Sequence, residues 1–266
     1  MINSVKYAEN GSGALANLIG WIDYGKGFTI SNNQSVNVIN KIYDDYKISF
    51  NIRVSFNPNA TYLTMESFIP PVFNMSNIPF GGIEYKKIDG YVVLYMPEAT
   101  LSPGITTTTL IISNISVTKN DEPITNYVIF AADAETTNYS NNVLETWTAT
   151  TNGDKWGLLN FMDSQDQNGE PPKIEGLGSD IIKEIGEKEG MSLVKSPVYF
   201  TTSPTELTFS FTTENSREGI ALGITLLNIP EIRKYIKIVP CCCYDKCSCC
   251  KYRYENYCRY YNAYIG

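Results

Sequence analysis

The sequence predicts an all-β protein, a β-sandwich of jelly-roll or lectin-like type with at most one short helix and a cysteine-rich C-terminal tail. The first observation is that residues 47–56 alternate strictly between polar and apolar side chains. This alternation is typical of a strand with one buried face. The apolar members are Ile48, Phe50, Ile52, Val54 and Phe56. The other two observations are further strand-like segments and the turn-forming residues between them.

The further segments are rich in β-branched and aromatic residues, as strands are. Residues 205–211 repeat the alternation, and residues 106–118 combine a run of threonines with isoleucine and valine. Turn-forming pairs such as Asp89-Gly90 and Asn152-Gly153 separate the segments. Many short strands divided by such turns predict a sandwich. The remaining candidates are residues 36–43, 91–95, 127–131, 144–150, 219–226 and 232–239.

One segment favours a helix. Residues 179–189 begin with a serine suited to an N-cap, contain helix formers, and space three isoleucines as a helix does. We therefore expect a short helix there. We also expect two parts: a sandwich over residues 1–228, and a final strand with the attachment tail over residues 229–266. By position, residues 1–13 and the strand at 232–239 could each pair with another subunit's sheet edge.

Composition excludes several classes of function. The chain has no histidine, which removes the commonest general base and most catalytic zinc sites. Its net charge is −7, and this acidity argues against a nucleic-acid partner. No apolar run is long enough to span a membrane, and the N-terminus lacks the pattern of a Sec-type signal peptide. We expect a non-enzymatic protein without cofactors.

All cysteines lie in the tail, so the body does not depend on disulfides. Adjacent cysteines rarely bond to each other, because disulfide geometry needs a larger separation of their Cα atoms. The number of cysteines is odd, which leaves at least one thiol after internal pairing. We therefore expect intermolecular disulfides to copies of the chain or to other surface subunits. The candidates are Cys241, Cys242, Cys243, Cys247, Cys249, Cys250 and Cys258.

Two alternatives for the tail stay open. Cys247 and Cys250 form a C-x-x-C pair that, with Cys243 and Cys258, could bind zinc through four thiolates, but a second well-spaced pair is missing. A reduced tail without fixed structure is the other alternative. We favour disulfides over metal.

The three tryptophans are candidates for ligand binding. Trp21, Trp147 and Trp156 could form a platform on which sugars stack, although tryptophans of a sandwich more often pack in its core or rim. Asp133 and Glu135 lie two residues apart, but a glycosidase needs a carboxyl pair across a cleft. Four oxygen-bearing residues around Gly169 resemble a calcium loop without its full spacing, and a solvated loop is favoured. They are Asp163, Asp166, Asn168 and Glu170.

An ordered set of segments resembles the second non-repetitive domain of the streptococcal surface adhesin CshA, a module shared by many bacterial surface proteins. The resemblance covers residues 8–227 and carries no catalytic motif. It implies a lectin-like sandwich displayed on a cell surface, with adhesion or fibre-building as its role. The segments are residues 15–25, 106–118, 130–138, 144–160, 203–211 and 218–224.

These observations support three hypotheses of function. The first is a structural, adhesin-like subunit of an extracellular or spore-surface assembly (a fibre, appendage or coat) that is cross-linked through tail disulfides. The second is an adhesin or lectin that binds a host glycoprotein or glycan and uses the tail as an anchor. The third is a zinc-binding tail that mediates contact with a partner.

Overall fold

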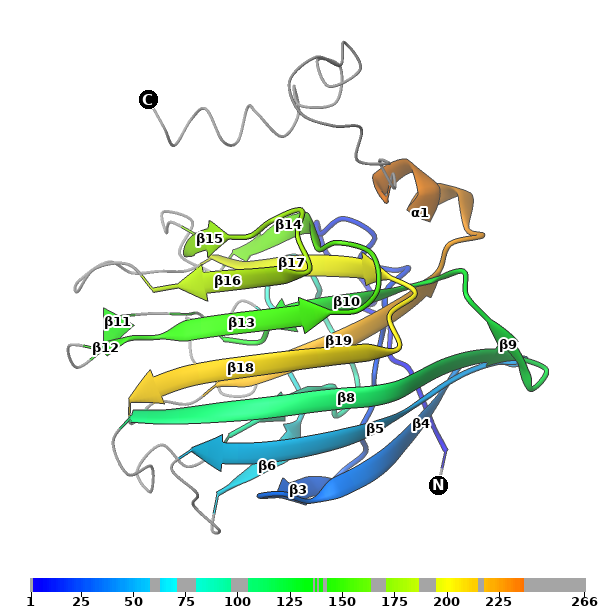
Figure 1. The fold of residues 1–266 in the computed structure, drawn as a ribbon. Coiled ribbons are helices and arrows are strands. Elements are labelled where there is room, and N and C mark those ends of the chain that lie inside the picture. The colour runs from blue at the N-terminus through cyan, green and yellow to red at the C-terminus, as the bar shows by residue number, and fades with distance from the viewer. Residues whose placement is uncertain are drawn as a thin grey trace, which may run out of the picture.

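Two packed β-sheets form the protein in a computed structural model (Figure 1). The structure describes residues 2–57, 63–70, 80–96, 105–135, 137, 139–140, 143–163, 171–186, 195–214 and 218–236. The all-β sandwich predicted from the sequence is confirmed. Among the described residues, no helix is long and apolar enough to cross a membrane.

The front sheet, which faces the reader in Figure 1, has nine strands. Its strand order is β1-β4-β5-β8-β18-β13-β16-β15, with β9 paired to β8. Its pairs are antiparallel except for β1 with β4. The bounds are β1 (Asn3–Ser4), β4 (Ser35–Tyr43), β5 (Tyr46–Asn57), β8 (Ile105–Lys119), β9 (Glu122–Ile124), β13 (Thr146–Thr151), β15 (Lys173–Glu175), β16 (Ile181–Ile185) and β18 (Glu206–Glu214).

The back sheet has eight strands in the order β14-β17-β10-β19-β7-β6-β3, with β2 paired to β19. Its bounds are β2 (Gly20–Trp21), β3 (Thr29–Ser31), β6 (Thr64–Phe68), β7 (Val93–Tyr95), β10 (Tyr127–Asp133), β14 (Gly157–Asp163), β17 (Lys195–Thr202) and β19 (Gly219–Leu226). A separate hairpin consists of β11 (Tyr139–Ser140) and β12 (Val143–Leu144).

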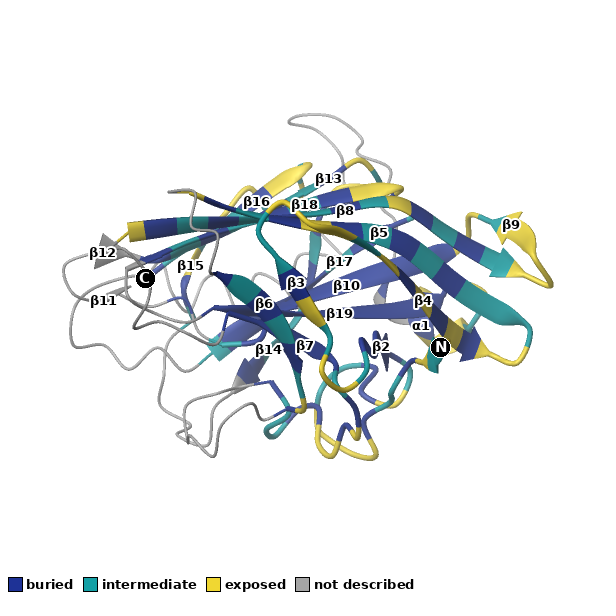
Figure 2. Cartoon of the chain, turned by 90° about the horizontal axis from the view of Figure 1, so that it is seen from below, coloured by how far each residue is buried: buried dark blue, intermediate teal, exposed yellow. Residues whose placement is uncertain are grey.

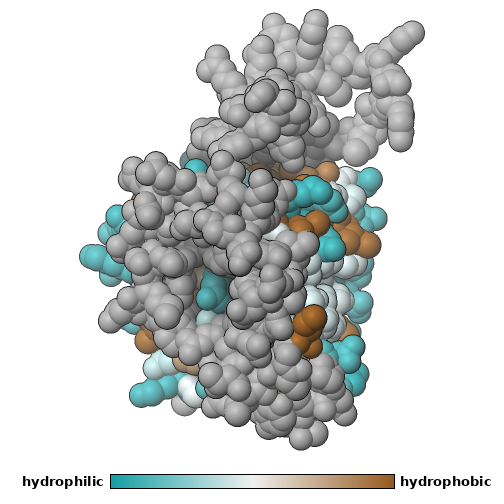
Figure 3. Space-filling model, turned by 90° about the vertical axis from the view of Figure 1, so that its left-hand side faces the viewer, coloured by the Kyte–Doolittle hydropathy of each residue, from teal (hydrophilic) through white to brown (hydrophobic). Residues whose placement is uncertain are grey.

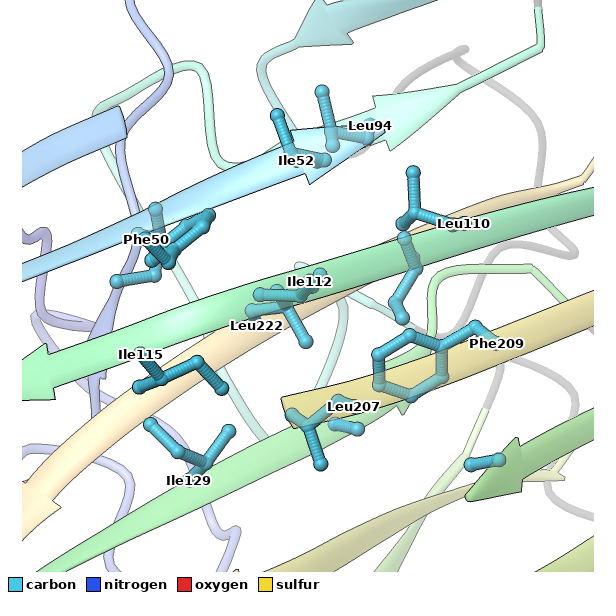
Figure 4. Packing of buried hydrophobic residues seen from close by; sticks show 14 of the residues in the cluster. Phe50, Ile52, Leu94, Leu110, Ile112, Ile115, Ile129, Leu207, Phe209 and Leu222 are labelled. Atoms are coloured by element: carbon cyan, nitrogen blue, oxygen red, sulfur yellow. The ribbon is translucent and has the colours of Figure 1, made fainter. Parts of the chain in front are cut away.

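The main core fills the space between the sheets. The apolar residues of β5 face inward and are buried, while the polar residues between them face outward, as their alternation predicts. Figure 4 shows Ile112 of β8 beside Leu222 of the back sheet, and Ile115 of β8 beside Ile129 of the back sheet. The front sheet therefore has one dry face and one face open to solvent.

A second core covers the opposite face of the back sheet. There Trp21 packs edge-on against Phe80 and Tyr85, with ring centroids 4.6 and 5.4 Å away. Because both faces of the back sheet are covered, every residue of β10 and of β19 is buried. These two strands read as continuous apolar runs, which is the pattern that burial on both faces requires.

The helix expected at residues 179–189 is wrong. The described part of this segment contains strand β16, which pairs with β13 and β15. Ile182 and Glu184 point inward and are buried, whereas Ile181 is exposed, so the side chains follow a period of two. Pairing with two neighbours overrides the local helix propensity, which is a weak preference.

The strand expected at residues 232–239 is also wrong where the structure describes it. The chain forms α1 (Pro230–Tyr235), with Pro230 in the first turn, where its missing N–H costs no hydrogen bond. Ile232 and Ile236, four residues apart, are both buried in the second core. This spacing suits one face of a helix. Residues 237–266, including the whole cysteine tail, lie outside the described residues.

The N-terminal arm pairs within its own chain. Strand β1 pairs in parallel with β4, the Lys6 and Trp21 backbones bond to each other, and Asn10 bonds to Lys86. Because β1 is the outermost strand of the front sheet, the pairing of this arm with another subunit's sheet edge stays a prediction.

Candidate functional site

The outer face of the front sheet carries an ordered array of hydroxyl groups. Its three central strands β8, β18 and β13 are adjacent and antiparallel, so outward side chains form rows across them. Neighbours in a row are about 4.8 Å apart, and successive rows are about 7 Å apart. The rows are Thr107, Thr212 and Thr146; Thr109, Ser210 and Thr148; and Ile111, Thr208 and Thr150. We call these eight hydroxyl-bearing residues the hydroxyl array.

The array follows from the inward burial of the alternate residues. On β13, Trp147 and Ala149 are buried, so Thr148 between them must face outward. On β18, Phe209 and Phe211 fix Ser210 in the same way. Figure 2 shows the resulting stripes along the front sheet, with buried residues alternating with partly exposed ones.

The hydroxyl array is reachable and capable of hydrogen bonding. Its members are of intermediate exposure because sheet neighbours flank each side chain. Thr107 Oγ1 and Thr212 Oγ1 lie 3.1 Å apart and bond across the strands. A hydroxyl donates one hydrogen bond and accepts two, so each member keeps further bonding capacity. The array therefore suits a ligand whose own groups both donate and accept.

The eight residues of the hydroxyl array are uncharged, and charged side chains stand at its borders. The chain has 28 acidic residues against 21 basic ones, yet the outward positions of β4, β5, β8, β13 and β16 hold no aspartate or glutamate. Glu206 and Glu214 are the first and last residues of β18. Lys41, Lys47, Arg53 and Lys183 carry positive charge on this face. Glu206 of β18 is exposed on it, and the exposed Glu175 of β15 follows Lys183 in the middle row. The array is thus an uncharged polar surface on an acidic protein.

Apolar side chains border the array. Ile111 lies within its third row and is partly exposed, and Ile181 follows Thr150 in the same row with 54% of its side chain exposed. Ile185 stands next to Thr146. In Figure 3 the right-hand margin, where the front sheet lies, is largely white with brown and teal patches. The face therefore offers hydroxyls beside small apolar areas.

The described residues contain no ligand-sized cavity between the sheets. The space found there measures about 10 Å³ and lies in the main core. It is lined by Ile22, Ile48, Phe50, Ile112, Ile115, Ile129, Leu207, Leu222 and Gly223. In this part of the chain, no three acidic or cysteine side chains are grouped to hold a metal ion.

The tryptophan platform predicted as an alternative is corrected by the structure. Trp21 and Trp147 are 0% exposed and Trp156 is 1% exposed. Trp147 stacks on Tyr199 at 5.7 Å and packs against Phe209, so its faces contact protein. Three buried indoles offer no ring face to a sugar, and they serve as the core packing that was weighed beside sugar stacking.

The other residues singled out in the sequence are placed only in part by the structure. Asp133 is fully buried at the end of β10, while Glu135 accepts a hydrogen bond from the Tyr95 hydroxyl at 3.1 Å. The segment around Gly169, for which the sequence favours a solvated loop over a calcium site, falls mostly in residues 164–170, outside the described residues. The cysteines lie outside them as well, so disulfide and zinc bonding of the tail stay predictions.

No single sequence motif predicts the hydroxyl array. Its signal in the sequence is the recurrence of threonine or serine at every second position of 107–109, 146–150 and 208–212. That signal acquires meaning only when the three segments are known to be neighbours, which the sheet register supplies.

Comparison with known proteins agrees with this fold. The family model described as surface adhesin CshA non-repetitive domain 2 matches residues 17–225. The chain belongs to this family. The family suggests a non-enzymatic adhesin at a cell surface or in the extracellular space, which binds surface ligands such as glycans or proteins. The resemblance predicted from the ordered segments is thereby confirmed.

Solved structures give a more distant likeness. The chain is similar to the N-terminal domain of the Streptococcus gordonii adhesin Sgo0707, with 11% identity and a TM-score of 0.39. The alignment covers 84% of this chain and 57% of that one, so the chain spans little more than half of the solved protein. A search of curated proteins finds no match.

Proposed function

We propose that this protein is an adhesin whose body binds a neutral glycan of a surface glycoprotein through the hydroxyl array of the front sheet. The observation that carries the proposal is the uncharged hydroxyl array on the outer face of a member of an adhesin family. The glycan would lie across the rows, with its hydroxyls bonded to threonine and serine and its C–H groups against the bordering isoleucines.

The composition of the face favours a glycan over a protein surface. The cores of protein–protein interfaces are enriched in aromatic residues, methionine and arginine, and are depleted in serine. The described outward positions of the three central strands hold no aromatic residue and no methionine. Hydroxyls that donate and accept match the hydroxyls of a sugar.

The tail completes the proposal as an attachment device. Seven cysteines follow residue 240 and none precedes it, so any disulfide of this chain joins tail residues to each other or to another molecule. We propose intermolecular disulfides that link the adhesin to its own copies or to other surface subunits, as in a spore coat or appendage. This part of the proposal rests on the sequence alone.

The test is a glycan array probed with the full-length reduced chain and with one triple variant. The variant Thr109→Val, Ser210→Ala and Thr148→Val removes the three hydroxyls of the middle row and preserves side-chain volume closely. Each lost neutral hydrogen bond costs about 1 kcal/mol, so the variant should bind about a hundredfold more weakly. Surface changes of this kind leave stability nearly unchanged.

A matched control lies on the same sheet beyond the array. The control variant Ser49→Ala, Ser116→Ala and Thr118→Val removes three outward hydroxyls near the β4–β5 and β8–β9 turns. It should bind as the unmodified chain does. Equal losses in both variants, or silence of the unmodified chain across all glycans, would refute the assignment of the array as the binding face.

A further inference from the structure

Four carboxyl groups from the two sheets face one another at one end of the sandwich. Two come from the back sheet and two from the front sheet, and all four residues are at most 4% exposed. We call Asp133, Glu145, Glu184 and Glu218 the carboxyl cluster. Buried carboxyl groups are rare unless they are paired, so a cluster of four demands a physical explanation.

The strand periods place these side chains in the space between the sheets. In the back sheet, Asp133 lies two and four positions along β10 from Ala131 and Ile129 of the main core, so its side chain points to the same face as theirs. Glu218 immediately precedes β19 and has the parity of Ile220. Asp133 pairs with Ile220 in the sheet register, so these two acids are close neighbours.

The front sheet supplies the other two acids on its inner face. Glu184 of β16 lies on the same side as Ile182 and opposite Trp147 in the register. Glu145 immediately precedes β13 and has the parity of Trp147, and its carbonyl accepts the Gly186 N–H at 3.0 Å. Both carboxyls therefore point toward the back sheet.

Hydrogen bonds connect the sheets within the cluster. The Thr137 hydroxyl lies 3.0 Å from Asp133 Oδ2 and 3.5 Å from Glu184 Oε2, so it bridges a back-sheet acid and a front-sheet acid. The Glu135 N–H donates to Asp133 Oδ1 at 2.9 Å. Glu184 Oε1 and Glu218 Oε2 are buried without a hydrogen-bond partner in the described structure. When Glu184 and Glu218 are protonated, these two oxygens would carry the carboxyl protons.

The electrostatic surroundings favour the neutral acids. Burial, followed by the charge of Glu145, raises the pKa of Asp133 to about 7 against hydrogen bonds that lower it. Burial raises the pKa of Glu184 and of Glu218 as well, with Asp133 as the largest charge acting on each. Two causes thus act in one direction, since desolvation and like charges both penalise carboxylates.

Other titratable groups also face the cluster. Glu135 lies beside it and adds to the negative charge that acts on Glu218. Tyr199 of β17 lowers the pKa of Glu184 by hydrogen bonding, and Tyr95 of β7 donates to Glu135. Lys195, the first residue of β17, is half-buried and shares the parity of Tyr199. Among the described residues, the charges of Asp133, Glu135, Glu145 and Glu184 act on the three shifted acids.

We propose that the carboxyl cluster is a proton-operated latch that holds the two sheets together at this end of the sandwich. With protons bound, the acids are neutral, and the Thr137 hydroxyl bridges Asp133 and Glu184 across the interlayer space. When the protons leave, the like charges of the two sheets repel each other and loosen this end. The apolar core continues to hold the rest of the interlayer space.

The direction of the pH effect follows from proton linkage. An acid with a raised folded-state pKa holds a proton that the unfolded chain has released. Its stabilisation is complete below the unfolded value, which is 3.8 for Asp133, and is lost as the pH rises through the folded value of about 7. Stability should therefore fall from mildly acidic to neutral pH, with a slope that counts the retained protons.

The experiment is urea unfolding of the reduced full-length chain at a series of values from about pH 5 to about pH 7. The unfolding constant of the unmodified chain should rise about tenfold per pH unit for each retained proton. The slope of the logarithm of the unfolding constant against pH therefore equals the number of retained protons. Glu218→Gln and, in a separate variant, Asp133→Asn should each lower this slope by up to about one. Glu206→Gln, at an exposed acid of the front sheet, serves as the matched control and should leave the slope unchanged.

Three results would overturn the latch. First, the unfolding constant of the unmodified chain could stay constant or fall as the pH rises. This result is measured without any variant. The slopes of both neutral variants could equal that of the Glu206→Gln control. Millimolar calcium could abolish the slope in the unmodified chain but not in Glu218→Gln, in which case the carboxyls hold a cation instead of protons. A calcium-independent slope that the two variants reduce would support the latch.

Discussion

Truncation of Ile112 to alanine tests the orientation of the front sheet on which the binding face depends. Ile112 lies in the middle of β8, is 1% exposed, and lines the small space in the main core (Figure 4). Its neighbour Ile111 points to the opposite face and takes part in the third row of the array. A shift of β8 by one residue would exchange the two side chains.

The expected loss follows from burial and cavity formation. An isoleucine-to-alanine change in a core costs about 2 to 5 kcal/mol, because the removed methyl groups lose their contacts and leave a void. The new void would join an existing space of about 10 Å³, and strands from both sheets surround it. Ile112→Ala should therefore fall in the upper half of that range, at about 4 kcal/mol. For a chain of this size the melting temperature should drop by about 8 to 16 °C.

The assay is thermal or urea unfolding of the reduced chain, with Ile111→Ala as the matched control. The control removes the same groups from the outer face of the same strand and should cost about 1 kcal/mol or less. Glycan binding of Ile112→Ala, measured well below its melting temperature, should be retained. If Ile111→Ala proved as costly as Ile112→Ala, the inward assignment of Leu110 and Ile112, and with it the hydroxyl array, would fail.

Two further predictions concern a turn and the tail. Gly176 has φ +78°, and an added Cβ would lie 2.1 Å from the Ile181 carbonyl oxygen, whereas Gly178 has φ +81° and nothing within 4 Å of that position. In urea unfolding, Gly176→Ala should therefore lose clearly more stability than the control Gly178→Ala. The control costs only the backbone strain of about 1 kcal/mol. Equal losses in the two variants would contradict the described turn. The unmodified chain should form covalent oligomers on non-reducing gels after oxidation in air. Replacement of all seven tail cysteines by serine should abolish these oligomers and leave the melting temperature unchanged. An unmodified chain that stays monomeric after oxidation would argue against cross-linking.

The strands with alternating patterns could be predicted from the sequence, because their apolar residues mark the buried face and their polar residues mark the exposed face. Strand β5 is the clearest case, since its five apolar residues all face the main core. Continuous apolar runs such as β10 and β19 showed a strand but not its environment, because burial on both faces erases the alternation.

The errors arose where local preference and tertiary contact disagree. Strand β16 contains good helix formers, yet its pairing with β13 and β15 and the inward burial of Ile182 decided its structure. In α1 the reverse happened, because a short apolar segment can form either a strand or a helix. Packing of Ile232 and Ile236 on the second core selected the helix.

The candidate sites also depended on contacts between distant segments. The tryptophans were visible in the sequence, but only the structure showed that their rings are enclosed. Residues of the carboxyl cluster are separated by up to 85 positions, and no short motif joins Asp133 to Glu218. Their proximity is a property of the register between β10 and β19 and of the packing of the two sheets.

By itself the sequence determined an all-β body without cysteine or histidine, its adhesin family, and the separation of every thiol into the tail. Those properties follow from composition, from the period of two, and from an ordered set of local segments. Only the tertiary structure decided that threonines of three strands form one face and that four acids meet inside. The physical reason is that strand register and sheet packing join residues far apart in the chain, and local patterns carry no information about which partner a strand will choose.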